Sequence, residues 1–328
     1  MAEDSSRNFH YGGQAVIEGV MMRGQRFFAV ACRRSDGEIS ATAEPIEGSI
    51  LGKLKWLNRP FLRGTLALAD ALVLGMKSLM WSANLAMADE QAKTAPKSAE
   101  AASPGRAGST RVNDAALSLA MFAAFALAIL IFFYAPIRLT RLMLGGATEN
   151  RAWLGLTEGG IKITFFFLYV WGISRWKDIR RVFEYHGAEH KVINAFEAGE
   201  ELEANRVQRF TTVHVRCGTS FLLVVILVSI LVFSAVPWRS ALERLGYKLL
   251  LLPVVAGVAY EIIKFAGSRK GWRWVRLLLS PGLLMQRITT QEPSDDQIEV
   301  AIKAFQSVRE AEATSTLTPE SRTLTPDS

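Results

Sequence analysis

Two uncharged apolar runs limit what this chain of 328 residues can fold into. One run covers residues 115–134 and the other covers 218–238, and neither contains a charged side chain. An α-helix needs about 20 apolar residues to cross the roughly 30 Å hydrocarbon core of a bilayer. A helix buried in a soluble core is the alternative, but such helices seldom lack charge over this length. We therefore expect a mainly α-helical integral membrane protein.

Two further apolar stretches extend this expected membrane domain, at 154–174 and 249–265. Each is about as long as a membrane-crossing helix, although each carries charge near one end. With the two uncharged runs, they predict about four transmembrane helices within residues 113–280.

The charged residues of these two stretches call for partners, because charge inside a membrane is costly. Glu158 and Lys162 are four residues apart, so we expect them to pair on one helix face. Glu261 lies near the end of its stretch, and Lys264 or Arg63 is its expected partner. Glu261 also remains a polar candidate for metal binding or proton transfer.

A long helical pattern at 61–88 has two interpretations. Arg63, Asp70 and Lys77 recur every seven residues and therefore share one face. The pattern fits either an amphipathic helix in the membrane interface, re-entrant or lying flat, or a span with a polar stripe packed inside a bundle. The cost of charge at mid-membrane favours the interfacial or re-entrant helix.

The N-terminal segment, residues 1–60, is expected to be soluble and rich in β-structure. Residues 14–24 are predicted to form one strand that ends at Gly24. Asp36-Gly37 separates two further strand-like stretches and is a strong β-hairpin signal.

The remaining segments are expected to lie in water. Residues 89–112 and 311–328 are small and polar, which predicts a disordered linker and a disordered tail. Residues 281–310 are expected to contain a C-terminal cytoplasmic helix. Ser294 is its predicted N-cap, and Gln297 completes a capping box.

Lys and Arg are distributed unevenly among the connections. The connection at 175–217 is rich in them, whereas the other two short connections hold three each; its basic residues are Arg175, Lys177, Arg180, Arg181, Lys191, Arg206, Arg209 and Arg216. The positive-inside rule places this connection and both termini in the cytoplasm. The net charge of +7 could also suit nucleic acid, but the basic residues flank apolar runs and no nucleic-acid module is visible. The expected partners are the lipid bilayer and either another membrane protein or a second copy of the chain.

Three of the four histidines lie in the connection at 175–217. A helix is predicted from about 184 to 198, so that His186 and His190 project from one face and can chelate one metal ion. Glu189 lies on nearly the same face and Glu197 two turns further along it. His186 to His190 also satisfies the H-x-x-E-H pattern of inverzincin peptidases, in which the glutamate activates a zinc-bound water.

His214 and Cys217 follow three residues apart, just before the run at 218–238. Imidazole and thiolate are both good zinc ligands. If these two residues and both helical histidines bind, the site is closed and structural. If only three bind, a position stays open for water and catalysis can follow.

Interpretations without a metal remain open. The histidine pair can be solvated or paired with Glu184, Glu189 or Glu197. Cys217 can be a small apolar residue at a helix start, or a covalent nucleophile with a histidine partner.

Four blocks of sequence together resemble one family; they are GGQAVIEGVMMRG at 12–24, YHGAEHKVINAFEAG at 185–199, HVRCGTSF at 214–221, and PGLLMQRITTQEP with DDQIEVAI within 281–302. The chain is similar to the YqhQ-like family of multi-pass bacterial membrane proteins, which are described as predicted metal-dependent enzymes. The resemblance implies a bacterial inner-membrane location and a metal role for the same His, Glu and Cys positions. Val215 and Gln291 depart from the family pattern, which has proline and arginine there.

Two functions follow as expectations. In the first, the protein is a zinc-dependent hydrolase with Glu189 as general base and His186, His190 and either His214 or Cys217 as ligands. In the second, the cluster is structural, and the protein is a scaffold, an assembly factor or a transport-related factor of the membrane. In both, the cofactor is a divalent metal ion such as zinc.

Overall fold

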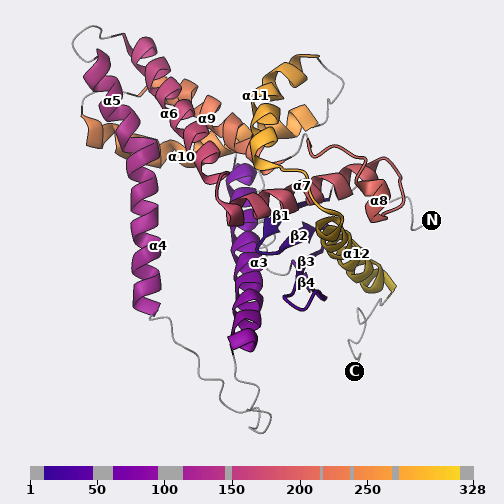
Figure 1. Cartoon of the computed structure of the whole chain (residues 1–328). Helices are drawn as coiled ribbons and strands as arrows, with labels where there is room; N and C mark the ends of the chain where they lie inside the picture. Colours follow the sequence, from indigo (N-terminus) through magenta and orange to yellow (C-terminus); the bar gives the residue numbers. More distant parts are fainter. Residues whose placement is uncertain are drawn as a thin grey trace, which may run out of the picture.

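The fold is mainly helical and includes an N-terminal four-stranded antiparallel sheet (Figure 1). It was obtained as a computed structural model. The structure describes residues 11–46, 62–94, 114–144, 150–214, 217–236, 240–267 and 273–317. Each statement below refers to these residues.

The sheet is a simple meander in which each strand pairs with the next one along the chain. The strands are β1 Gly12–Val16, β2 Gly19–Arg23, β3 Phe27–Arg33 and β4 Ile39–Pro45. Gly37 has a φ of 93° in the turn between β3 and β4, which confirms the hairpin signal of Asp-Gly. The sheet thereby confirms the expected β-rich N-terminal region.

The strand expected over residues 14–24 is wrong, because the chain reverses at Ile17 and Glu18 to form two strands. Glu18 has a φ of 52°, a conformation that glycine normally supplies, at a cost of about 1–2 kcal/mol for other residues. Its carboxylate accepts hydrogen bonds from Arg181 and from the Tyr185 hydroxyl, at 3.3 Å from the latter. These contacts help hold the turn against the helix that carries the histidines.

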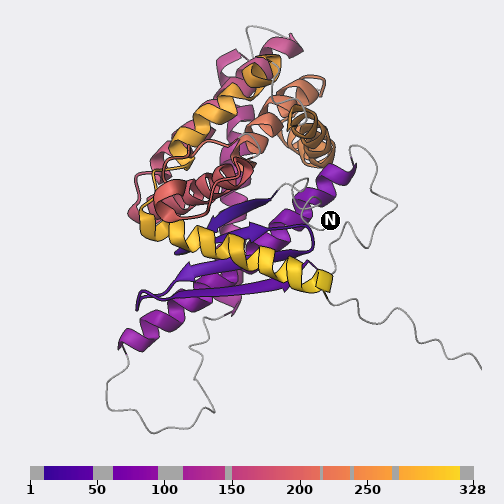
Figure 2. The ribbon, with the colours of Figure 1, turned by 90° about the vertical axis from the view of Figure 1, so that its right-hand side faces the viewer.

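Helices cover both faces of the sheet. α3, Leu62–Thr94, lies on one face, while α7, Lys177–Glu197, and α12, Asp295–Leu317, lie on the other (Figure 2). Side chains alternate between the faces as the pleat requires, with Met21 directed to α3 and Met22 to α7 and α12. We call the sheet with α7, α12 and the short α8, Ala204–Val207, the sheet domain.

The main core of the sheet domain joins three distant parts of the chain. Tyr11 contacts the rings of Phe196 and Phe305, at centroid distances of 5.5 and 4.9 Å. The strands, the middle of the chain and the C-terminal helix therefore fold as one unit.

The other helices form the helix bundle: α4 Asp114–Ile129, a π-helical turn Leu130–Tyr134, α5 Ala135–Leu144, α6 Arg151–Ile173, α9 Gly218–Ser234, α10 Ala241–Gly267 and α11 Arg273–Thr289. α6, α9 and α10 pack together, whereas α4 extends away from them (Figure 1). α3 joins the bundle to the sheet, since Arg63 makes two hydrogen bonds to Glu261 of α10 while Leu74 packs on the strands.

Several expected boundaries need correction. The helix expected over 115–134 continues past Pro136 to Leu144, with the π turn just before the proline, which cannot donate to the helix ladder. The histidine helix begins at Lys177 rather than near 184 and ends at Glu197, close to the expected 198, and Gly199 follows it with a φ of 77°.

The segments expected to be disordered are partly helical. α3 runs to Thr94 and α12 runs to Leu317, because both continue their contacts beyond the predicted ends. The helix expected within 281–310 is α12, which begins at Asp295 beside the predicted capping residue Ser294, and the same segment also holds the end of α11. The rest of the expected linker and tail, 95–112 and 318–328, lies outside the described residues.

Two helices of the described chain are long and apolar enough to cross a membrane, Arg63–Lys93 and Phe122–Leu144, and Phe221–Ser234 is a shorter apolar helix. The second overlaps the run expected at 115–134. The first is the helix that the sequence favours as interfacial.

Candidate metal centre

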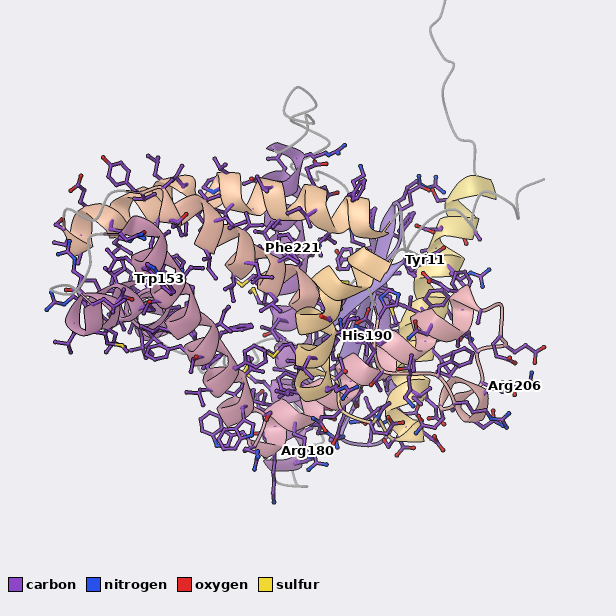
Figure 3. The ribbon with its side chains drawn as sticks, turned by 90° about the horizontal axis from the view of Figure 1, so that it is seen from above. Tyr11, Trp153, Arg180, His190, Arg206 and Phe221 are labelled. Atoms are coloured by element: carbon purple, nitrogen blue, oxygen red, sulfur yellow. The ribbon has the colours of Figure 1, made fainter. Side chains whose placement is uncertain are left out.

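α7 belongs to the sheet domain and lies where this domain meets the helix bundle, and its two histidines face the bundle. His190 lies at this junction, well away from Trp153 at the opposite end of the bundle (Figure 3). The helix is buried over most of its second half. The spacing of four residues does place the two imidazoles together, with ring centroids 4.5 Å apart.

Backbone carbonyls orient both rings. The Nδ1 of His186 is 2.8 Å from the Thr289 carbonyl oxygen, and the Nδ1 of His190 is 2.5 Å from that of Thr212. Since a carbonyl only accepts, both Nδ1 atoms carry the proton and both Nε2 atoms present a lone pair. This arrangement of a ring nitrogen on a fixed acceptor is typical of metal-binding histidines.

Cys217 completes a group of three ligand atoms. It is the N-cap of α9, and its Sγ lies 3.2 Å from the Nε2 of His186. The ligand atoms of His186, His190 and Cys217 all lie within 4.8 Å of one another. Zinc bond lengths of about 2.3 Å to sulfur and 2.0–2.1 Å to nitrogen imply ligand separations of roughly 3.5 Å in a tetrahedral site. Small shifts of these side chains would therefore accommodate the ion.

Glu189 lies beside this group on the sheet side of α7. Its Oε2 is 3.9 Å from the Nε2 of His190, and its carboxylate accepts a hydrogen bond from the Gly13 backbone of β1. Burial raises the pKa of this carboxyl to about 7, against the opposing effect of the hydrogen bond from the Gly13 backbone. The residue named from the sequence as the general base is thus buried next to the ligand atoms.

His214 is near the group but is not one of its three members. Its ring centroid is 5.6 Å from that of His190. Gln286 of α11 fixes its backbone by accepting from the His214 N–H at 2.9 Å and donating to the His214 carbonyl at 2.8 Å. His214 therefore lies where a modest movement would make it a fourth ligand.

The remaining sequence candidates lie elsewhere. Glu197 is exposed at the last residue of α7. Glu261 pairs with Arg63, one of its two expected partners, in the contact between α3 and α10. Glu158 does not pair with Lys162 as expected, because Arg244 and Lys248 of α10 reach its carboxylate instead.

The sequence did not predict the segment that packs across α7 and holds the His186 ring in position. Residues 289–293, here called the C-terminal strap, cross α7 between α11 and α12. The Gln291 N–H donates to the Phe183 carbonyl at 3.0 Å, and Glu292 forms an ion pair with the buried Lys191. The approach is so close that a Cβ on Gly187 would lie 2.0 Å from the Gln291 oxygen. Gly187 is therefore required by the strap that also presents the Thr289 carbonyl.

Fold and site together define a mainly helical protein with a small sheet domain and a candidate metal group of two histidines and one cysteine. The chain belongs to a family described as "Protein of unknown function (DUF1385)", whose model matches residues 59–311. It is 34% identical over 312 residues to "Uncharacterized protein YqhQ" of Bacillus subtilis (strain 168). These aligned residues cover 93% of this chain and 94% of that protein. No solved structure matches the chain.

Proposed function

We propose that this chain is a multi-pass protein of the bacterial inner membrane that binds a zinc-like divalent ion and uses it for hydrolysis. The observation that carries the proposal is the group of His186, His190 and Cys217, with both Nδ1 atoms held by carbonyls and all ligand atoms within 4.8 Å. Three protein ligands leave one tetrahedral position for water.

The exposed apolar surface supports the membrane location. Phe122 and Phe125 on α4 are 70% and 67% exposed, and Leu168 and Trp171 on α6 are exposed as well. Soluble monomers rarely expose large contiguous apolar areas, whereas a lipid-facing surface is built from them. Lipid is therefore the proposed environment of the helix bundle.

The sheet domain constrains the topology. It is built from the start, middle and end of the chain, so these parts must share one side of the bilayer. The chain must therefore cross the bilayer an even number of times between β4 and α7. The same holds between α7 and α12. The stretch from α4 to α5 with α6 supplies one pair of crossings, and α9 with α10 supplies the other.

A crossing by α3 would make the number between β4 and α7 odd. We therefore place α3 on the membrane surface. α3 lies along one face of the sheet, where Leu74 packs on the strands. The basic connection that contains α7 favours the cytoplasm for the sheet domain and hence for both termini.

Glu189 is the residue that supports hydrolysis rather than storage of the ion. Its carboxylate is 3.9 Å from a ligand nitrogen, close enough to accept a proton from a water in the open position. The Gly13 N–H orients the carboxylate from the opposite side. A divalent ion held by these three residues would lower the pKa of a bound water, and Glu189 would be the base placed to accept its proton.

A second candidate function is a structural clasp, and the burial of the group favours it. His190 and Cys217 are only 1% and 6% exposed, and the His214 ring is adjacent. With His214 as a fourth ligand, the ion would fasten α7 of the sheet domain to α9 of the bundle. Such a closed site stabilises structure without catalysis.

The test is metal analysis of the full chain purified in detergent, combined with X-ray absorption at the metal edge. The hydrolytic site predicts one ion per chain, coordinated by one sulfur, two nitrogens and one oxygen. Cys217→Ser and His190→Ala should lose the ion, while His214→Ala should retain it. Coordination by one sulfur and three nitrogens, with loss of the ion in His214→Ala, would establish the clasp instead.

Absence of stoichiometric metal in the wild type would exclude both functions. The 3.2 Å contact between Cys217 and His186 would then be a thiol–imidazole hydrogen bond. Alkylation of Cys217 that slows in His186→Ala would identify it as a reactive pair.

A further inference from the structure

A second cluster of charged residues is buried at the far end of the helix bundle. Glu158 and Lys162 come from α6, and Arg244 and Lys248 come from the start of α10. The residues are 3%, 7%, 0% and 0% exposed. Four ionisable side chains are thus removed from water within a bundle whose outer surface is apolar.

One carboxylate cannot balance the three cations. Arg244 donates its Nε–H to Glu158 at 3.0 Å, and Lys248 forms an ion pair with the other oxygen of the same carboxylate. Arg244 also donates to the carbonyls of Phe233 and Val236, which end α9. The carboxylate and the end of α9 are therefore both occupied by α10.

Lys162 is left without an anion. Within the described chain it has no hydrogen bond or ion pair, and its Nζ contacts only ring faces, 5.3 Å from the centroid of Phe133 and 5.5 Å from that of Phe233. Cation–π contacts offset only part of the cost of burying an ammonium group. The formal charge of the cluster is +2, from three cations and one anion.

Lys162 and Arg244 line one small cavity of about 10 Å³, which Glu158, Ser229 and Phe233 also border. Gly155 and Gly159 allow α6 to approach α9 here, since a Cβ on either would press against Ser234 or Ile230. A cavity of this size has room for one water-sized occupant. Phosphate, sulfate and carboxylate ligands are too large.

We propose that this cavity is a binding site for a monatomic anion, with chloride as the ligand and the Lys162 ammonium as its main partner. An anion placed between Lys162 and Arg244 reduces the excess charge and gives Lys162 the counter-ion that it lacks. A water molecule would fit but would leave the charge at +2. The site is independent of the metal centre, so either proposal can fail without the other.

The experiment compares thermal unfolding of the detergent-purified full chain in chloride and in gluconate at constant ionic strength. Chloride should raise the midpoint by about 2 °C at a concentration tenfold above its dissociation constant. Lys162→Met should remove this dependence, since the partner is lost. Lys177→Met, at an exposed position on α7, is the matched control and should keep it.

Chloride NMR on the wild type provides a measurement that needs no variant. Protein should broaden the chloride line, and bromide should reverse the broadening by competition. The proposal is overturned if the line is unaffected, or if Lys162→Met keeps the full chloride dependence. Lys162→Gln replaces Lys162→Met should the latter not fold.

Discussion

The two ends of the helix bundle handle buried polar groups in opposite ways. At the junction with the sheet domain, two neutral imidazoles are fixed by the carbonyls of Thr212 and Thr289 and a thiol completes the group. At the far end, Glu158 pairs with Arg244 and Lys248, and the buried Lys162 is left without an anion among the described residues. The first arrangement preserves lone pairs for a cation, and the second preserves positive charge for an anion. Fixed ring orientations define the candidate site at the junction, and an excess of buried positive charge defines the proposed site at the far end.

The largest effect is expected from Arg244→Met, which should disturb the far end of the bundle and leave the metal group at the junction unaffected. The substitution leaves Glu158 with Lys248 alone and uncovers the carbonyls that end α9. Breaking a buried ion pair costs about 3–5 kcal/mol. Unfolding by detergent titration should show this loss, while the metal content per chain stays unchanged. A loss of metal would show that the two ends are coupled.

Gly187→Ala should act only at the junction. The added Cβ would lie 2.0 Å from the Gln291 oxygen and must displace the C-terminal strap that positions His186. Disturbing such a supporting group lowers metal affinity by about 10–100-fold. Competition with a fluorescent zinc chelator measures the change.

Gly160→Ala is the matched control for this substitution, because a Cβ there meets nothing within 4 Å. It should leave metal affinity as in the wild type. Equal affinities for the Gly187 variant and the wild type would refute the role of the strap.

Lys191→Met should give a smaller effect on the same strap. The Lys191 ammonium is buried and donates to the Gln208 carbonyl at 2.6 Å as well as to Glu292. Loss of these bonds should lower the free energy of unfolding by about 1–2 kcal/mol. Lys303→Met, at an exposed position on α12, should change little in the same detergent titration.

The smallest effect is expected from Lys77→Ala, which belongs to neither end. Lys77 pairs with Glu44 across the exposed edge of the contact between α3 and the sheet. Exposed pairs contribute about 0–1 kcal/mol. Both variants are compared by the free energy of unfolding from detergent titration. A larger loss for Lys77→Ala than for Lys191→Met would mean that the docking of α3 on the sheet contributes more to stability than the C-terminal strap does.

The sequence predicts features that depend on near neighbours. Asp36-Gly37 specifies its own turn, and the i, i+4 spacing of His186 and His190 is enough to place both rings on one face. Cys217 was a ligand candidate because a thiolate is a good zinc ligand and the residue follows His214 by three positions.

Features that depend on distant residues were missed. The turn at Glu18 carries its positive φ on a glutamate and not on the glycine that follows it, and it is held by Arg181 from another part of the chain. Glu158 ignores the lysine one turn away and pairs with residues of α10, since packing of α6, α9 and α10 decides which cation reaches it. Glycine at position 187 weakens the helix locally. The need for it follows only from the C-terminal strap, whose Gln291 backbone oxygen leaves no room for a Cβ.

The make-up of the sheet domain also sets an order of events during synthesis. Tyr11 and the strands leave the ribosome early, but their core is closed by Ile298 and Phe305 of α12. At about 5–20 residues per second, roughly 15–60 s separate Tyr11 from Phe305. All the helices between them emerge in this interval. His186 likewise gains its Thr289 acceptor only after α11 is complete. The candidate metal group is therefore assembled last, when nearly the whole chain has been made.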